Sequence, residues 1–211
     1  MGKNLELYGS GFVIGDGSYV VTNSHVIAKE LDESLLQELA VFTGKGSAAK
    51  VRVATLIATD KEHDIALLKI KGQPLPALQL AQSHFKPEGS AIAFTGFPIG
   101  AVLGLYPVTH RGIIAAVTPT IIPVDDSRQI SIAMIKRLRD PYLVYQLDAT
   151  AYPGNSGSAM YDIETGKVIG IINKVFVQES KETVISKPSG ITYAIPVKYL
   201  HQLLKKHKIK S

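Results

Sequence analysis

Cysteine is absent from this chain of 211 residues. Its absence excludes disulfides, thiolate metal sites and a cysteine nucleophile. Long apolar segments are absent as well, because no run of eighteen apolar residues occurs. The first residues also lack the apolar core of a signal peptide. The sequence therefore predicts no stable membrane insertion and carries no visible targeting information.

The net charge is small outside the C-terminal residues. The formal net charge is +5, and most of it comes from Lys205, Lys206, Lys208 and Lys210. The remainder is nearly neutral and lacks the basic stripe, interleaved with aromatic residues, that a nucleic-acid surface needs. We therefore expect no nucleic-acid partner. We interpret the lysines as a solvated helix end, with a contact to phosphate or anionic lipid as the alternative.

Short apolar, β-branched runs recur between glycine and proline turns, which is typical of an all-β barrel or sandwich. These runs occupy residues 11–14, 19–22, 51–59, 65–70, 90–95, 109–117, 144–148, 168–177 and 191–195. The sequence Gly15-Asp16-Gly17 predicts a hairpin turn. Residues 31–42 and 197–206 have apolar residues at helical spacing, whereas residues 131–138 are compatible with a helix or a strand.

Proline and glycine interrupt this rhythm once, between residues 71 and 89. The interruption predicts two β-barrels of ordinary domain size. We place an N-terminal barrel at residues 1–85 and a C-terminal barrel at residues 86–196. A helix with a basic tail follows at residues 197–211.

Three polar residues lie beside strand-like runs in the order His25, Asp64 and Ser156. A serine hydroxyl is a poor nucleophile, so acyl transfer needs a base within hydrogen-bond reach and a carboxylate that fixes the tautomer of that base. The N–H groups of Gly154 and Ser156 suit an oxyanion if their turn is tight. Each signal alone is as typical of a structural residue. Together they predict a site between the two domains, with Asp60 as the alternative carboxylate.

Seven segments in chain order resemble the HtrA (high-temperature-requirement) family of chymotrypsin-fold serine peptidases. They are residues 9–14, 21–27, 63–69, 96–100, 153–157, 168–171 and 193–196. The resemblance implies two orthogonal six-stranded β-barrels, with His25 as general base, Asp64 as its orienting carboxylate and Ser156 as nucleophile. It places the oxyanion hole at Gly154 and Ser156. It further implies a polypeptide substrate, no cofactor, a possible homo-trimer, and a periplasmic or secreted location.

The chain departs from the family pattern in several places. Ser158 replaces the usual glycine after Ser156-Gly157, and Ser24 replaces an asparagine before the histidine. Residues 31–42 add a helix-like insertion, and residues 119–143 are longer than expected where relatives carry activation and specificity loops. The sequence stops soon after its last helical segment, so we expect a protease domain without the PDZ domain that many relatives carry.

The same resemblance predicts the pocket for the substrate residue before the scissile bond, P1. Thr150, six residues before the nucleophile, would form an uncharged floor. Residues 173–175 and 191–193 would form the walls, with Val175 and Ile191 narrowing the slot. We therefore expect small aliphatic P1 residues, although both side chains are equally compatible with a core role. Asn173 would lie beside a substrate bound as an added strand.

Two function classes other than a serine peptidase are compared with the sequence. An α/β-hydrolase esterase needs Gly-x-Ser-x-Gly and the order Ser, Asp, His, which this chain does not have. A catalytically latent protease-fold protein that acts as a binding module or scaffold is the alternative that remains. The other histidines, at positions 63, 84, 110, 201 and 207, have no partner at metal-ligand spacing, so no metal site is expected.

Overall fold

The computed structural model describes residues 7–27, 38–98, 104–120, 141–173 and 191–210. The strands are β1 (Phe12–Ile14), β2 (Tyr19–Thr22), β3 (Ala40–Thr43), β4 (Lys50–Asp60), β5 (Ile65–Ile70), β6 (Ala91–Gly96), β7 (Val108–Pro119), β8 (Leu143–Asp148), β9 (Ala159–Asp162), β10 (Val168–Ile172) and β11 (Ile191–Pro196). The helices are the short 3-10 turns η1 (Ser24–Val26) and η3 (Gly46–Ala48), and α4 (Val197–Lys206).

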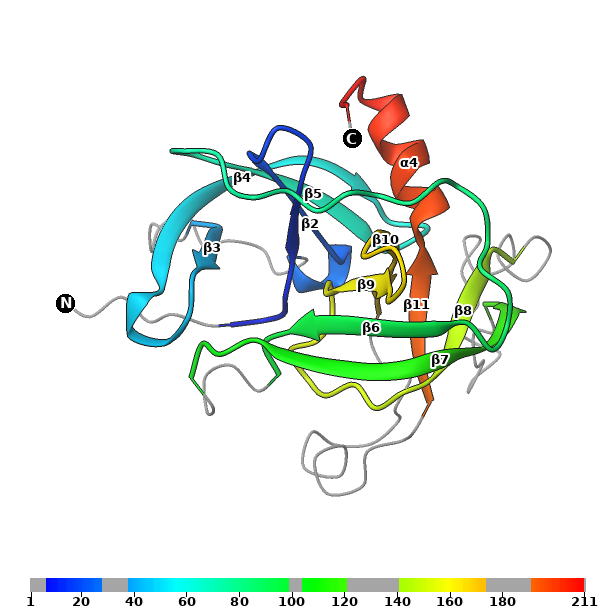
Figure 1. The fold of residues 1–211 in the computed structure, drawn as a ribbon. Helices are drawn as coiled ribbons and strands as arrows, with labels where there is room; N and C mark the ends of the chain where they lie inside the picture. Colours follow the sequence, from blue (N-terminus) through cyan, green and yellow to red (C-terminus); the bar gives the residue numbers. More distant parts are fainter. Residues whose placement is uncertain (1–6, 28–37, 99–103, 121–140, 174–190, 211) are drawn as a thin grey trace, which may run out of the picture.

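The strands form an antiparallel sheet and an antiparallel closed barrel (Figure 1). A five-stranded sheet has the order β1-β2-β5-β4-β3, and a closed barrel has the order β10-β11-β8-β7-β6-β9. This confirms the predicted all-β class and its C-terminal helix, as in the chymotrypsin fold. Within the described residues, the C-terminal barrel has the predicted six strands and is closed. The N-terminal unit is an open sheet of five strands instead of a second six-stranded barrel.

The helix predicted at residues 31–42 is wrong at its C-terminal end. Ala40–Thr43 forms β3, which pairs with β4 in a register that sets Phe42 opposite Val51. Leu39 extends this pairing, because its carbonyl accepts a hydrogen bond of 2.9 Å from Ala54 N. Pairing with a distant strand therefore outweighs the local helical spacing of the leucines. Residues 31–37, and the ambiguous segment at residues 131–138, lie outside the described residues.

One apolar core joins the sheet, the barrel and α4. Ile14 and Leu67 from the sheet, Ile171 and Ile195 from the barrel, and Leu203 from α4 all belong to it. The helix follows β11 directly, as Figure 1 shows, and buries Val197, Tyr199, Leu200, Leu203 and Leu204. A second cluster fills the barrel around Phe94, Tyr145 and Met160. The halves that carry the predicted site residues are therefore packed together by a shared interior.

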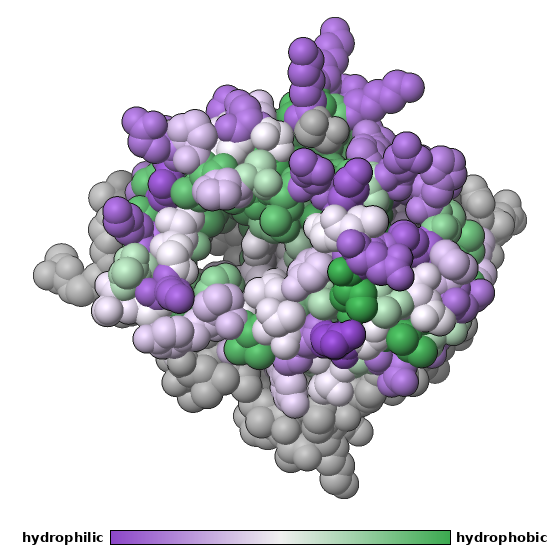
Figure 2. Space-filling view, viewed as in Figure 1, coloured by the Kyte–Doolittle hydropathy of each residue, from purple (hydrophilic) through white to green (hydrophobic). Residues whose placement is uncertain are grey.

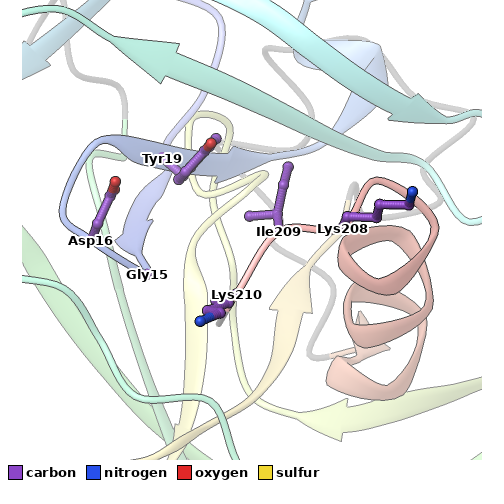
Figure 3. Close-up of a pocket in the computed structure, with 6 residues that line it drawn as sticks. All are labelled: Gly15, Asp16, Tyr19, Lys208, Ile209 and Lys210. Carbon is purple, nitrogen blue, oxygen red and sulfur yellow. The ribbon is translucent and has the colours of Figure 1, made fainter.

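The residues after α4 fold back on the β1–β2 hairpin. Ile209 and Tyr19 both pack against the shared core, and in Figure 3 Ile209 lies between Tyr19 and Lys208. These three residues line a small pocket with Gly15, Asp16 and Lys210, and none of the predicted catalytic residues lines it. Gly15 has a φ of +64°, which confirms the predicted turn.

The C-terminal lysines are exposed, in agreement with a solvated helix end. Hydrophilic side chains gather over this end of α4 at the top of Figure 2. Among the described helices, none has the length and apolar character that crossing a membrane requires.

The linker between β5 and β6 is pinned to both halves. Leu75 N and Leu78 N donate to Gly17 O and Val13 O of the first sheet, at 2.9 and 2.8 Å. Ala81 N then donates to Val168 O of the barrel at 2.8 Å. The chain therefore changes partners between residues 78 and 81, while the predicted domain limits remain a prediction.

Asp162 fixes the β9–β10 turn and ties it to the linker. Its Oδ1 accepts hydrogen bonds of 2.9 Å from the backbone of Glu164 and Thr165. Its other carboxylate oxygen forms an ion pair with Lys86 Nζ. The hydrogen bond from Lys86, with the two turn N–H groups, lowers the pKa of Asp162 to about 2 against its buried position.

We expect Asp162→Asn to remove a pH-dependent part of the stability. The folded pKa lies below the unfolded value of 3.8, so the ionised carboxylate stabilises the fold above that pH, and the stabilisation is lost as the pH falls toward 2. The variant should be less stable than the parent by about 2 kcal/mol at pH 7, and the difference should close between pH 4 and 2 in urea unfolding. Glu164→Gln, exposed in the same turn, is the matched control. A pH-independent difference contradicts the assignment.

Candidate active site

His25 and Asp64 form a direct pair at the end of β2. His25 lies in η1, and its Nδ1 is 2.6 Å from Asp64 Oδ2. The backbone N–H of His25 donates to Asp64 Oδ1 at 2.8 Å, so the carboxylate holds both the ring and the main chain. A carboxylate at Nδ1 favours the tautomer with its proton there, which leaves Nε2 as a base. The ring side chain is 35% exposed and accessible to substrate.

Asp64 adopts an unusual backbone conformation to make this pair. Its φ is +54°, in the left-handed region that non-glycine residues rarely occupy. Its carbonyl accepts hydrogen bonds from Ser24 N at 3.1 Å and from the buried Asn23 Nδ2 at 3.0 Å. Three consecutive residues, 23–25, therefore bind one aspartate, which compensates for the strain.

Asp60, the alternative carboxylate, is paired with a different histidine. Its Oδ2 is 2.7 Å from His63 Nδ1, and its Oδ1 accepts from the backbone N–H groups of Glu62 and His63. The His63 ring stacks on Tyr199 of α4 with centroids 4.0 Å apart and meets the edge of Tyr142. Burial alone would raise the pKa of Asp60, but the hydrogen bonds from His63 and Glu62 together outweigh it and lower the pKa. Asp60 therefore stabilises the turn that contains Asp64. The carboxylate that pairs with His25 is that of Asp64.

Within the described ranges, two N–H groups of the turn that carries Ser156 have no partner. Asn155 N donates to Tyr152 O at 3.0 Å, and Gly157 N donates to Ile172 O at 2.9 Å. Among the residues that the structure describes, the N–H groups of Gly154 and Ser156 make no hydrogen bond. Two neighbouring free N–H groups in a glycine turn are what an oxyanion requires. The oxyanion hole at Gly154 and Ser156 stays a prediction and is taken up below as a proposal.

Ser10 anchors this turn to the first sheet with three polar groups. Its hydroxyl donates to Gly154 O at 2.6 Å and accepts from Phe97 N at 2.9 Å. Its backbone N–H donates to Ser156 O at 2.8 Å. Its own carbonyl accepts from Thr22 Oγ1 at 2.7 Å, which ties Ser10 to the end of β2. The strand end before His25 and the turn of Ser156 are thus joined through one serine.

Close packing between the two segments leaves no room for side chains at two glycines. A Cβ on Gly9 would lie 2.7 Å from Val26 Cγ2 and 2.8 Å from Ser156 O. A Cβ on Gly157 would overlap Ser10 O and Thr22 Oγ1. The neighbour of His25 and the backbone of Ser156 therefore touch the same glycine, which brings the two predicted catalytic segments together.

The predicted P1 residues are only partly described. Thr150 follows β8 and is half-buried between the buried Ala149 and Ala151. Asn173 follows β10, and its N–H donates to Tyr193 O at 2.9 Å. Val175 and the side chain of Ile191 lie outside the described residues.

Thr192, within the predicted wall segment 191–193, is fully buried, and the sequence did not predict its role in holding the neighbouring backbone. Its hydroxyl donates to Ala149 O at 2.6 Å and accepts from Ala151 N at 3.2 Å, so it holds the backbone on both sides of Thr150. A buried threonine in a run of strand residues gives no sequence signal of such a role. Within the described ranges, no group of three or more histidine or acidic side chains is placed to hold a metal ion.

Comparisons with known proteins agree with this geometry. The family described as "Trypsin-like peptidase domain" matches residues 9–171. A "Probable periplasmic serine endoprotease DegP-like" of Halomonas elongata is 30% identical over 90% of this chain and 32% of its own length. The protein of the same description from Pseudomonas fluorescens is 31% identical over 92% of this chain and 34% of its own length. The chain thus spans about one third of the length of these curated relatives.

Solved structures show the same similarity. The "HtrA-type protease AlgW with decapeptide" superposes with a TM-score of 0.70 at 27% identity, covering 95% of this chain and 51% of that one. The "serine endoprotease from Yersinia pestis" superposes with a TM-score of 0.67 over 98% of this chain and 60% of that one. Its 24% identity supports the fold alone.

We expect Gly157→Ala to be much more destabilising than Gly89→Ala. Both glycines have positive φ, +87° and +80°, so alanine carries a backbone penalty of about 1 to 2 kcal/mol at either position. At Gly89 nothing lies within 4 Å of the added Cβ, whereas at Gly157 it meets Ser10 and Thr22. Overpacking should add about 1 to 3 kcal/mol there. Urea unfolding of the two variants measures the difference, and equal losses would show that the contact is relaxed in solution.

Proposed function

Since the chain belongs to the trypsin-like peptidase family, we propose that it is a serine endopeptidase of the HtrA kind that cleaves polypeptides through an acyl-enzyme. The observation that carries the proposal is the pair of free N–H groups at Gly154 and Ser156. They lie in the turn that Ser10 ties to the segment before His25. A latent scaffold with the same fold would not need two unpaired amides beside a serine.

The proposed reaction begins with attack of Ser156 Oγ on the substrate carbonyl carbon. The hydroxyl proton passes to His25 Nε2, while Asp64 stabilises the imidazolium through Nδ1. The carbonyl oxygen becomes an oxyanion and accepts hydrogen bonds from Gly154 N and Ser156 N. Collapse of the intermediate breaks the carbon–nitrogen bond, and His25 returns the proton to the leaving amine. Water, activated by the same histidine, then releases the acyl group and restores Ser156.

The proposed substrates are unfolded or flexible polypeptides with small aliphatic P1 residues. An uncharged, half-buried Thr150 at the floor of the pocket offers no countercharge to lysine or arginine. The similar protease AlgW was solved with a decapeptide, which supports a polypeptide ligand for this chain. A periplasmic location, named in the relatives' descriptions, and a homo-trimer remain predictions.

Ser156→Ala should abolish peptide hydrolysis, with a loss of about 10⁶ in kcat, because the nucleophile is removed. Hydrolysis of casein and labelling by a fluorophosphonate probe measure this directly. Ser83→Ala, at an exposed serine of the linker, is the matched control and should keep both activities. Retained hydrolysis in Ser156→Ala would contradict the nucleophile assignment. A parent chain that neither cleaves casein nor reacts with the probe would favour the scaffold function.

Thr150→Asp should shift the P1 preference toward lysine and arginine. A carboxylate at the pocket floor supplies the missing countercharge, so kcat/KM for basic P1 substrates should rise about tenfold or more relative to valine. Thr150→Asn is the control, because asparagine has the shape of aspartate without its charge. Peptide substrates that differ only at P1 measure the ratio. An unchanged ratio would place the pocket floor elsewhere.

A further inference from the structure

The side chain of Asn155, the residue between the two predicted oxyanion donors, is buried and its hydrogen bonding is incomplete. The residue lies between Gly154 and Ser156 and is fully buried. Its Nδ2 is 3.4 Å from His110 Nε2. Its Oδ1 has no hydrogen-bond partner among the described residues, and neither does the hydroxyl of the buried Ser158. Buried polar atoms in native proteins are almost always paired, so this pattern needs an explanation.

The two unpaired oxygens border the same small space beside Gly96. A Cβ added to Gly96 would lie 2.7 Å from Asn155 Oδ1 and would overlap Ser158 Oγ. Turning the amide by 180° exchanges its oxygen and nitrogen without moving any other atom. The nitrogen then faces Ser158 Oγ, and the oxygen faces His110 Nε2. The rotation therefore turns complementary groups toward each other on both sides of the amide, with His110 Nε2 as the donor to the amide oxygen.

His110 is held firmly enough to act as a fixed donor. It extends from β7, and its ring stacks on Phe94 with centroids 4.9 Å apart and planes 23° apart. The ring of Tyr152 lies 5.8 Å away, and the carbonyl of the same tyrosine accepts the backbone N–H of Asn155 at 3.0 Å. The histidine therefore contacts both ends of the turn that precedes Ser156. Burial lowers the pKa of its imidazole, which favours the neutral ring.

We propose that His110 is a positioning residue for the oxyanion turn, acting through a chain of hydrogen bonds from His110 Nε2 to Asn155 Oδ1 and from Asn155 Nδ2 to Ser158 Oγ. The inference rests on the proposed peptidase function and extends it to a residue of β7. Holding the Asn155 side chain fixes the peptide planes on either side of it. The plane after it carries the N–H of Ser156, and the plane before it carries the carbonyl of Gly154, so the aim of the Ser156 N–H depends on His110.

The test compares His110→Phe with His110→Gln. Phenylalanine keeps the ring against Phe94 and Tyr152 but removes the nitrogen, whereas glutamine keeps a donor. Since the loss of a whole oxyanion donor costs about 10²–10³ in kcat, a misdirected turn should cost His110→Phe about tenfold or more in kcat, with KM within about twofold. His110→Gln should recover kcat to within about threefold of the parent. A peptide boronate should lose affinity for His110→Phe in proportion to kcat.

His84→Phe is the matched control, because His84 is exposed in the linker. It should leave kcat and KM unchanged. A parent-like kcat in His110→Phe, a loss carried by KM alone, or no recovery in His110→Gln would overturn the inference while leaving the peptidase function intact. A parent chain without hydrolysis overturns the proposed function instead.

Ser158→Ala decides the hydrogen-bond network even if His110→Phe does not fold or the parent is inactive. If Asn155 Nδ2 donates to Ser158 Oγ, loss of the hydroxyl leaves a buried donor unpaired and lowers the urea midpoint. If Ser158 Oγ is unpaired, its removal leaves the midpoint unchanged or raises it. The first result supports the chain of hydrogen bonds, and the second overturns it.

Discussion

The hydrogen bonds of Ser10 are the constraint on which the rest of the site depends. A turn with two unpaired amides gains little from its own contacts. The bonds from Ser10 to Gly154 O and Ser156 O fix the Gly154–Asn155 and Ser156–Gly157 peptide planes, which border the plane that carries the N–H of Ser156. Because Ser10 is in turn held by Thr22 at the end of β2, the turn is fixed relative to the sheet that presents His25.

Two Asp–His pairs involve the β4–β5 turn, and only His25, from η1, comes from outside it. Asp60 and His63 pack against Tyr142 and Tyr199 and fasten the turn to the second half of the molecule. That attachment allows the next residue, Asp64, to hold a left-handed backbone conformation. Strain at a functional residue persists only where its surroundings determine the conformation fully. The first pair supplies these surroundings, and the second is the more exposed of the two at its histidine.

Local patterns predicted the fold well where strands are regular. The limits of β2 and β5 follow from short apolar runs bounded by turn residues, and those of α4 follow from apolar residues at helical spacing. β3 was missed because its leucine-rich approach has helical spacing, and only pairing with β4 makes it a strand. The short β9 was missed because it begins two residues after the glycine of the nucleophile turn, within a segment that was interpreted for its chemistry.

The candidate catalytic residues were predictable because serine chemistry demands a particular set of side chains in a recognisable order. The residues that hold these candidates in place were not predictable. Ser10 lies in a Gly-Ser-Gly sequence that indicates only a flexible turn, and His110 and Thr192 lie in strands with ordinary composition. Each acts through a hydrogen bond to a residue more than 40 positions away. Such contacts depend on how the barrel closes, which no local pattern records.

The anchor of the oxyanion turn also bears on synthesis of the protein. Ser10 and Gly154 are separated by 144 positions in the chain, so their hydrogen bond is among the contacts of highest order in the fold. Such contacts form late, because closing a long loop costs entropy before any packing rewards it. A nascent chain on the ribosome holds Ser10 long before Gly154 emerges. The turn that carries Ser156 is therefore anchored to the first sheet only once nearly the whole chain has been made and its tertiary structure forms.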